Sequence, residues 1–180
     1  DAIAGAAHSV GSIVVVDNTF LSPVLQQPLN LGADIVIHST TKYINGHSDV
    51  VGGAVIAKTQ ELFDRLKYWA NCLGLTASPF DAYLTLRGLR TLKARLNLHL
   101  ANTKAVVRVL GAHAAVQKVH YPGLKDHPGH AIAVKQQSGF GGIVSFELKG
   151  GKEAAWRLID STRLISITAN LGDTKSTITH

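Results

Sequence analysis

The sequence predicts an α/β protein, because short apolar segments of strand type alternate with segments of helical periodicity along the chain. Residues 13–17 and 35–38 are rich in β-branched side chains, and a polar turn follows each run, as is typical of buried strands. From Pro79 to beyond Leu110, leucines recur instead at helical spacing. No repeat of fixed period appears, so these alternating patterns decide the class.

The first two predicted strands are expected to lie side by side and parallel. The spacing from Asp17 to Lys42 is about the length of a β-α-β step between parallel strands. The carboxyl ends of parallel strands meet at one edge of the sheet, where open α/β sheets bind ligands. The expected elements of this half are a helix tail and turn at 1–11, strand 13–17, a loop at 19–28, a short helical or turn segment at 29–34, strand 35–38, strand 54–57 and helix 58–73.

A long helix is predicted to follow. Ser78 and Pro79 form a strong helix start, with a hydroxyl at the cap and proline in the first turn. Gly88 inside this helix costs up to ~1 kcal/mol relative to alanine unless close packing requires it. The remaining expected elements are strand 116–120, a loop at 125–130, helical turns at 131–137, strand 142–148, helix 153–161 and strand 164–168.

Composition excludes several functional classes. The 180 residues carry a net charge of +6, but the basic side chains are dispersed among acids and form no stripe with interleaved aromatics, which argues against nucleic-acid binding. No apolar run is long enough to span a membrane. The single cysteine, Cys72, excludes an internal disulfide framework, fits a reducing cytoplasm and is expected to be an ordinary packing residue. His127 and His130 lack partners at ligand spacing, so zinc is not expected.

Residues 38–49 contain the densest cluster of side chains that can bind a ligand or take part in a reaction. Lys42 follows a predicted strand and is flanked by Ser39 and Thr41, which gives one amine beside small donors suited to phosphate. These are the parts needed to hold a phosphorylated aldehyde cofactor as a Schiff base. Asp17 ends the neighbouring strand, and a half-buried carboxylate there would need a cationic partner such as a protonated ring nitrogen. The alternative is a solvated lysine with hydroxyls and an acid that cap turns.

Two other segments have a simpler interpretation. His47 and Asp49 could support the lysine as polar neighbours, but a turn in which Gly46 takes positive φ and Asp49 acts as a cap is favoured. The glycine-rich segment 138–142 precedes a predicted strand rather than a helix, so a bulge or a tight strand entry is favoured over a phosphate loop.

Several segments closely resemble the cystathionine γ-synthase branch of the Cys/Met-metabolism pyridoxal phosphate enzymes. They are residues 16–23, 31–34, 38–53, 69–71, 80–83, 86–92, 136–142 and 171 onward. The resemblance implies fold-type I, the aspartate-aminotransferase-like fold. It also implies that residues 1–100 are part of the cofactor-binding large domain and residues 101–180 part of the C-terminal α/β domain. Members of this family are much longer, so the chain, which contains no methionine, is expected to be a middle segment of one.

The resemblance also assigns roles to individual residues. The lysine that matches Lys42 bonds covalently to pyridoxal 5'-phosphate and moves protons during the reaction. The acid that matches Asp17 pairs with the ring nitrogen of the cofactor. The hydroxyls that match Ser39 and Thr41 bind its phosphate, and the one that matches Thr19 packs near its ring. Further phosphate-loop glycines, a ring-stacking tyrosine and a carboxylate-binding arginine are expected outside these 180 residues.

The implied reaction is a γ-replacement, in which a thiol displaces the acyl group of an O-acylhomoserine. Residues 43–53 and 80–92 favour a cystathionine γ-synthase, which makes cystathionine from O-succinylhomoserine and cysteine in methionine biosynthesis. Ala169 stands where many of these synthases have glutamate, and the block 168–175 looks more like that of O-acylhomoserine sulfhydrylases and methionine γ-lyases. Asn170 could still donate to a substrate carboxylate through its amide.

The resemblance also implies how the protein assembles and whether this segment is active by itself. The family is typically homotetrameric and acts on small molecules. Because part of the pocket is expected outside the chain, the isolated segment is expected to bind cofactor weakly and to be inactive. The alternative from a different class is a segment that serves only in oligomer contacts.

Overall fold

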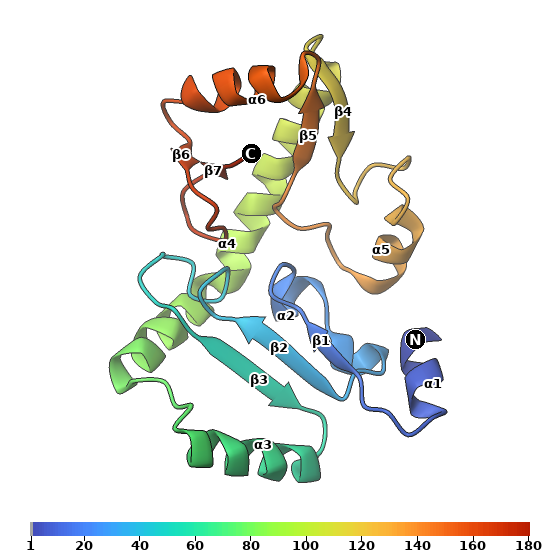
Figure 1. Ribbon diagram of the computed structural model, residues 1–180, viewed down its shortest axis with the longest axis vertical. Helices are drawn as coiled ribbons and strands as arrows, with labels where there is room; N and C mark the ends of the chain where they lie inside the picture. Colours follow the sequence, from blue (N-terminus) through green and yellow to red (C-terminus); the bar gives the residue numbers. More distant parts are fainter. Residues whose placement is uncertain (1) are drawn as a thin grey trace.

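A three-stranded sheet organises the first half of the computed structural model, which describes residues 2–180. Its strands are β1 (Val15–Asp17), β2 (Ile35–Ser39) and β3 (Gly53–Ala57), in that order across the sheet. The expected parallel pairing of β1 and β2 is confirmed, with Asp17 opposite Ile37, whereas β3 runs antiparallel to β2. The carboxyl ends of β1 and β2 therefore lie at one edge of the sheet (Figure 1).

The connection from β1 to β2 is more helical than predicted. It contains α2 (Ser22–Leu25) and the 3₁₀ turn η1 (Pro28–Leu31), within and just after the segment predicted as loop. Pro23 is tolerated because it occupies the first turn of α2, where its missing N–H has no helical partner. Both α2 and η1 are limited to four residues, because Pro23 and Pro28 lie close together and a proline inside a longer helix would remove a backbone hydrogen bond.

One face of the sheet is less covered than predicted. Side chains alternate between the faces of a strand, so Val36 and His38 point one way and Ile37 the other. Val36 and His38 are each 3% exposed, but Ile37 is 37% exposed and Val15 48%. Asp17, which shares that face, is exposed as well. The predictions of a fully buried second strand and a half-buried Asp17 are therefore wrong for this chain, because no layer of residues 2–180 packs over that part of the sheet.

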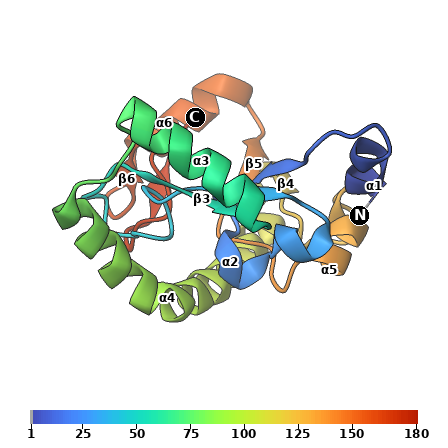
Figure 2. The same ribbon diagram turned by 90° about the horizontal axis from the view of Figure 1, so that it is seen from below.

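Two helices follow the sheet, and both predictions are confirmed. Helix α3 (Gln60–Leu73) begins at Thr59, whose hydroxyl accepts from the Leu62 N–H at 3.3 Å, and runs alongside β3 (Figure 2). Cys72 is exposed on α3 and not packed as predicted, because α3 buries none of its residues.

Helix α4 (Pro79–Ala112) spans 34 residues and begins at Ser78, whose hydroxyl accepts from the Asp81 N–H at 3.1 Å. It runs from the sheet to the C-terminal elements (Figure 1). The predicted domain division near residue 100 falls inside this helix and stays a prediction. No helix among residues 2–180 is both long and apolar enough to cross a membrane.

The C-terminal part is built on a second sheet of two antiparallel strands. It pairs β4 (Val116–His120) with β5 (Ser145–Leu148), and the helices α5 (His130–Gln136) and α6 (Gly151–Asp160) accompany them. The predicted strand 142–148 is shortened at its start, because residues 138–142 form a loop tied to α2 through Ser138. The predicted strand 164–168 is reduced to β6 (Ser166–Ile167), which pairs in parallel with the unpredicted β7 (Thr177–Ile178).

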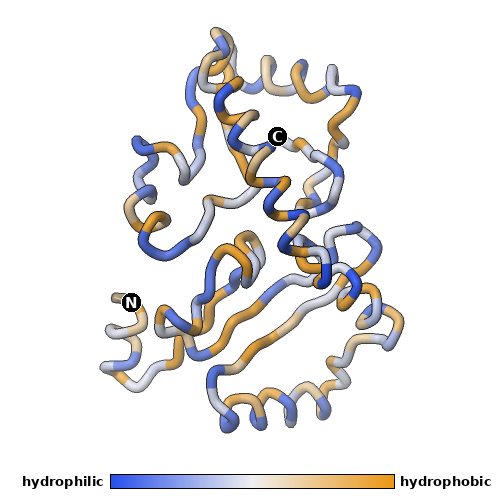
Figure 3. Tube along the Cα trace, turned by 180° about the vertical axis from the view of Figure 1, so that it is seen from behind, coloured by the Kyte–Doolittle hydropathy of each residue, from blue (hydrophilic) through white to orange (hydrophobic). Residues whose placement is uncertain are grey.

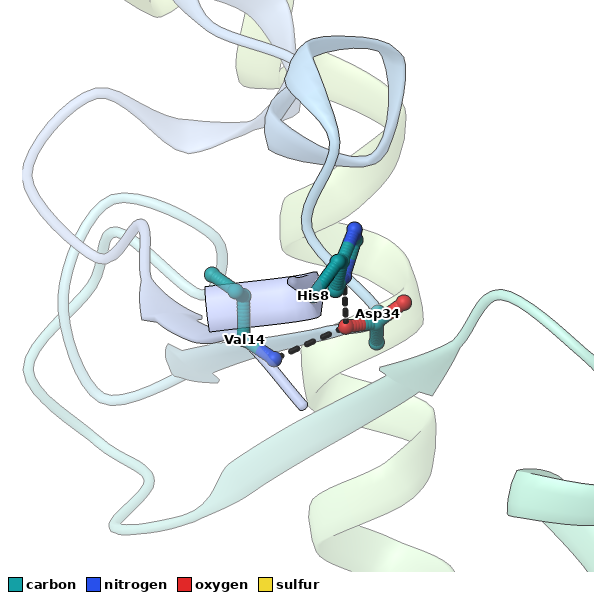
Figure 4. A network of polar contacts seen from close by, with 3 residues as sticks. All are labelled: His8, Val14 and Asp34. Atoms are coloured by element: carbon teal, nitrogen blue, oxygen red, sulfur yellow. Dashed lines mark hydrogen bonds and ion pairs between the residues drawn. The ribbon is translucent and has the colours of Figure 1, made fainter. Parts of the chain in front are cut away.

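Helix α1 (Ala2–His8) is tied to the sheet through one carboxylate (Figure 4). Asp34 accepts from the Val14 N–H at 2.8 Å and forms a second bond of 2.8 Å with His8 Nε2. These two hydrogen bonds, with that to the His8 side chain the larger influence, lower the pKa of Asp34. Asp34 therefore joins α1 to the starts of β1 and β2, at the edge of the sheet opposite Lys42.

The hydrophobic core joins the segment after β2 to α4. Its buried members come from α2, from that segment and from α4, where apolar residues recur along the Cα trace (Figure 3). They are Leu25, Tyr43, Ile44, Leu92 and Leu96. Burying side chains of this size stabilises by about 1.5–3 kcal/mol each. The residues directly after Lys42 are thus fixed against the long helix.

Candidate functional site

Lys42 lies in a helix-like turn directly after β2. The Asn45 N–H donates to the Thr40 carbonyl and the Gly46 N–H to the Lys42 carbonyl, each at 2.9 Å. The amine of Lys42 donates to Asn170 Oδ1 at 2.8 Å. Lys42 therefore follows the carboxyl end of β2, at the edge of the sheet where the parallel strand β1 also ends.

Asp17 and Thr19 occupy the end of that neighbouring strand. The Thr19 N–H donates to Asp17 Oδ1 at 2.9 Å, and the Ser39 N–H donates to Thr19 Oγ1 at 2.8 Å. The side chain and then the backbone N–H of Thr19 hold the pKa of Asp17 below its usual value. Asp17 is therefore an anion at neutral pH, and the structure brings it together with Thr19 and Ser39 where β1 and β2 end.

The two hydroxyls predicted to bind phosphate differ in their surroundings. Thr41 Oγ1 accepts from the Gly52 N–H at 3.0 Å and donates to the Gly52 carbonyl at 3.4 Å, which closes the loop between β2 and β3. Within residues 2–180, the Ser39 hydroxyl makes no hydrogen bond. Ser39 can therefore donate to an anion directly, whereas Thr41 must exchange its weak bond to Gly52 for one to the anion.

The turn after Lys42 confirms the predicted positive φ of Gly46, whereas Asp49 binds a side chain and caps no backbone N–H among residues 2–180. Gly46 has φ +75°, a conformation that glycine adopts without strain. Asn45 Nδ2 donates to Asp49 Oδ1 at 2.6 Å, and the Asn45 carbonyl is bonded to His47 Nδ1 at 2.7 Å. Both side chains thus bind Asn45 within the turn, and in the described part of the chain neither is hydrogen-bonded to the Lys42 amine.

A hydrogen-bonded chain that the sequence did not predict leads away from Lys42. Asn170 accepts from the Lys42 amine, and its Nδ2 donates to Ser48 Oγ at 3.2 Å. The Ser48 hydroxyl donates to Asp173 Oδ2 at 2.6 Å. Burial would raise the pKa of Asp173, but the bonds from Ser48, Thr174 and the backbone outweigh it and lower the pKa. The motif positions of Ser48 and Asp173 were visible in the sequence, but their pairing across the chain was not.

Asn170 is placed at the site, but with its amide engaged. The sequence predicted that this amide donates to a substrate carboxylate, and in the structure it donates to Ser48 instead. Because an amide group carries two donor hydrogens, one remains available for a ligand. Substrate binding by Asn170 stays a prediction.

His38 belongs to the opposite face of the sheet. It is 3% exposed, its Nδ1 has no hydrogen-bond partner among residues 2–180, and burial lowers its pKa despite the nearby charge of Asp17. It lines a cavity of about 440 Å³ together with Val36, Thr85 and Leu89, between the sheet and α4. Because neighbouring residues of a strand face opposite ways, His38 and this cavity lie on the other side of β2 from Ile37 and Ser39.

The donor set at the edge of the sheet fits a phosphorylated aldehyde with a basic ring nitrogen. Lys42 supplies a primary amine, Asp17 an anionic carboxylate and Ser39 a hydroxyl without another partner. No group of three His, Cys, Asp or Glu side chains among residues 2–180 is arranged to hold a metal ion.

The whole sequence, residues 1–180, matches the family model described as Cys/Met metabolism PLP-dependent enzyme. The chain belongs to this family. Family membership confirms the predicted resemblance and identifies pyridoxal phosphate as the cofactor of this class of enzymes.

Relatives of this family match the chain along nearly all of its length. O-succinylhomoserine sulfhydrylase of Pseudomonas aeruginosa is 49% identical over 179 residues, which is 99% of the chain and 44% of that protein. Cystathionine gamma-synthase of Escherichia coli strain K12 is 49% identical over 174 residues, which is 97% of the chain and 45% of that protein. The chain thus spans less than half the length of these relatives.

A solved structure confirms the fold. Cystathionine gamma-synthase from Xanthomonas oryzae pv. oryzae, in complex with aminoacrylate and cysteine, superposes with a TM-score of 0.97 at 58% sequence identity. The match covers 99% of the chain and 46% of the Xanthomonas chain. The α/β arrangement of this member of the Cys/Met family is therefore that of fold-type I PLP enzymes, as predicted.

Proposed function

We propose that this chain carries the covalent anchor and the ring-nitrogen partner of a PLP-dependent γ-replacement enzyme that acts on an O-acyl-L-homoserine. The observation that supports this proposal best is the location of Lys42 and Asp17. They follow adjacent parallel strands at one edge of the sheet, inside a segment that matches the family model. When bound, pyridoxal phosphate supplies an electron sink for the carbon next to the substrate amino group.

The residues of the chain have distinct tasks in this proposal. Lys42 holds the cofactor aldehyde and, once released, carries the proton from the substrate carbon. Asp17 binds the protonated ring nitrogen and remains an anion because the Thr19 side chain and N–H lower its pKa. Ser39 and Thr41 bind the phosphate, and Thr19 keeps both Asp17 and the backbone of Ser39 in place.

Asn170 has two tasks at the substrate side. Its Oδ1 accepts from the Lys42 amine, which holds that amine in a defined direction while it is free. Its Nδ2 carries a hydrogen that Ser48 leaves available for the substrate carboxylate. Asn170 would therefore orient the proton carrier and the substrate together.

The acceptor that we propose first is cysteine, which makes the enzyme a cystathionine γ-synthase of methionine biosynthesis. The 58% identity to the Xanthomonas synthase supports this choice. An O-acylhomoserine sulfhydrylase, which uses sulfide, is the second candidate. Two observations favour it: Ala169 replaces an acid that could bind the ammonium of cysteine, and the Pseudomonas sulfhydrylase is as similar as the Escherichia coli synthase. A γ-lyase is the third candidate.

The test uses the cofactor-loaded enzyme that contains this chain. The visible absorbance of the lysine-bound cofactor is expected to disappear in Lys42→Ala and to persist in Lys104→Ala, a matched change on the exposed side of α4. An unchanged spectrum in Lys42→Ala would overturn the proposal. Turnover of O-succinylhomoserine with cysteine and with sulfide then separates the first two candidates, and a strong preference for sulfide would favour the second.

The assembly and location of the enzyme are part of the proposal. We infer a homotetramer in the cytoplasm that acts on small molecules. The exposed apolar face around Val15, Ile37 and Val55 is consistent with further protein layers over the sheet. Light scattering of the enzyme tests the assembly state, and a monomer at working concentration would refute it.

A further inference from the structure

The turn that carries Lys42 is held by one side chain of α4, Arg95. Its Nη1 donates to the Tyr43 carbonyl at 2.8 Å, and its Nη2 donates to the Ile44 carbonyl at 3.2 Å. The same Nη2 donates to the Gly88 carbonyl of α4 at 2.8 Å. The guanidinium is thus bonded to the helix and to the turn at once.

The turn needs such a donor for a physical reason. Tyr43 and Ile44 end a helix-like turn, and no backbone N–H among residues 2–180 donates to either of their carbonyls. Both residues are buried, and an unpaired buried carbonyl costs free energy comparable to a lost hydrogen bond. A planar guanidinium with its fixed fork of donors can satisfy two adjacent carbonyls together.

The contact between turn and helix leaves no room for a side chain at Gly46 or at Gly88. A Cβ added to Gly46 would lie 2.1 Å from Arg95 Nη1, and one added to Gly88 would lie 2.2 Å from the Asn45 carbonyl oxygen. The Arg95 Nε is held by Thr91 Oγ1 at 3.0 Å, which fixes the plane of the guanidinium. The turn therefore rests directly on the guanidinium and on the backbone of α4.

The charge of Arg95 also fits this location. Burial lowers the pKa of the guanidinium, and the nearby carboxylate of Asp173 opposes that effect. Because an arginine keeps its proton in proteins, the bonds to the carbonyls are charge-assisted. Asp173 also ends the chain of hydrogen bonds that leads from Lys42. Arg95 thus bonds the backbone of the lysine segment, and Asp173 bonds its Ser48 hydroxyl.

We propose that Arg95 is a positioning residue for Lys42: it fixes the backbone of the turn and thereby the direction from which the amine reaches the cofactor. The inference rests on the proposed function, since it takes Lys42 as the cofactor anchor. Arg95 acts through the turn and touches neither cofactor nor substrate.

The first test measures the turn itself by amide hydrogen exchange in the enzyme, with and without cofactor. In Arg95→Gln, the amides of Asn45 and Gly46 are expected to exchange at least about ten-fold faster, because hydrogen bonds to a charged group are removed. Arg95→Lys should give an intermediate rate, since an ammonium can still bond a carbonyl. Arg108→Gln, an exposed arginine of the same helix, is the matched control and should match the parent enzyme.

The second test follows the return of the lysine-bound absorbance after pyridoxal phosphate is added to cofactor-free enzyme. The rate is expected to fall roughly ten-fold in Arg95→Gln, with partial rescue in Arg95→Lys. Values equal to those of Arg108→Gln in both tests would overturn the inference. An equal acceleration of amide exchange in β2 would also overturn the inference, because such a result would indicate that the whole fold is destabilised and not the turn alone. If the parent enzyme never attaches cofactor at Lys42, the proposed function fails, and the exchange without cofactor still decides whether Arg95 holds the turn.

Discussion

The Lys42 amine and the Asn170 amide oxygen lie 2.8 Å apart, although 128 residues separate them in the sequence. The bond joins the segment after β2 to the loop between β6 and β7. Asn170 is itself oriented, because its amide nitrogen donates to Ser48, whose hydroxyl donates to Asp173. The direction of the Lys42 amine therefore depends on a segment from the other end of the chain.

Asn170→Ala is expected to raise the KM for the acylhomoserine about ten-fold, because it removes a hydrogen bond to a charged group. Ser48→Ala should have a smaller effect in the same direction, since Ser48 holds Asn170 and does not contact Lys42. Steady-state kinetics measure both values. Asn30→Ala is the control, since the Asn30 side chain bonds to Gln27 and to no other residue of the described range 2–180. A KM in Asn170→Ala equal to that of this control would contradict the assignment.

Asp17→Asn is expected to lower the turnover rate by about 10²- to 10³-fold, because it removes a fixed charge from the place where the reaction needs it. The fold should persist, since an amide oxygen can still accept from the Thr19 N–H. Asp34→Asn provides the contrast, as Asp34 lies at the opposite edge of the same sheet. It should lower the melting temperature and leave the cofactor spectrum unchanged. Equal losses of activity in both variants would argue against a role of Asp17 at the cofactor.

Gly88→Ala is expected to destabilise the protein by about 1–3 kcal/mol, because it overpacks the contact with the lysine turn. The added Cβ would meet the Asn45 carbonyl oxygen at 2.2 Å and the Ile44 carbonyl oxygen at 2.7 Å. Gly111→Ala, at an open position of the same helix, should have the opposite sign and stabilise by up to ~1 kcal/mol. Denaturant unfolding measures both changes. A neutral or stabilising effect of Gly88→Ala would show that the contact at Gly88 is not rigid.

Stability is expected to fall as the pH drops from about 7 towards 5, because burial lowers the pKa of His38 and of His99. A histidine with a lowered pKa in the folded state stays neutral there while the unfolded chain takes up a proton. Its contribution is thus complete above the unfolded pKa and is lost as the pH falls towards the folded pKa. Each proton changes the unfolding free energy by at most about 1.4 kcal/mol per pH unit.

His99→Phe tests this dependence, because it keeps the edge contact of the ring with Tyr43 and removes the titrating group. The slope of melting temperature against pH should become shallower than in the parent protein. His113→Phe, an exposed position just after α4, should leave the slope unchanged. An identical slope in both variants would assign the pH dependence to other groups.

The sequence alone predicted much of the local structure, since the signals lie within a few residues of each other. The predicted cap at Ser78 sets the start of α4, and Gly46 takes the positive φ that its turn was expected to need. Gly88 was expected to cost stability unless close packing required it, and the carbonyl of Asn45 lies directly against it. The least accurate predictions concerned the short strands near the C-terminus, because only two residues of each strand pair there.

Two contacts of the candidate site depended on the tertiary structure: the bond of Lys42 to Asn170 and the bonds of Arg95 to the lysine turn. The sequence placed Asp17 and Lys42 at the same edge of a parallel sheet, because the spacing between them fits one β-α-β step. It did not pair Lys42 with Asn170 or the turn with Arg95, because both contacts bridge segments far apart in the chain. It also predicted a half-buried Asp17, and the structure leaves this carboxylate exposed.

The sequence by itself determined the start of the long helix α4, the two parallel strands and the residue types at the edge of the sheet, because each follows from side-chain periodicity and backbone preference over a few residues. Only the tertiary structure decided which side chains hold Lys42 in place. Those partners come from α4 and from the loop after β6, and their approach depends on how the whole chain packs. Local preferences carry no information about distances across a fold, so this part of the site could not be read from spacing.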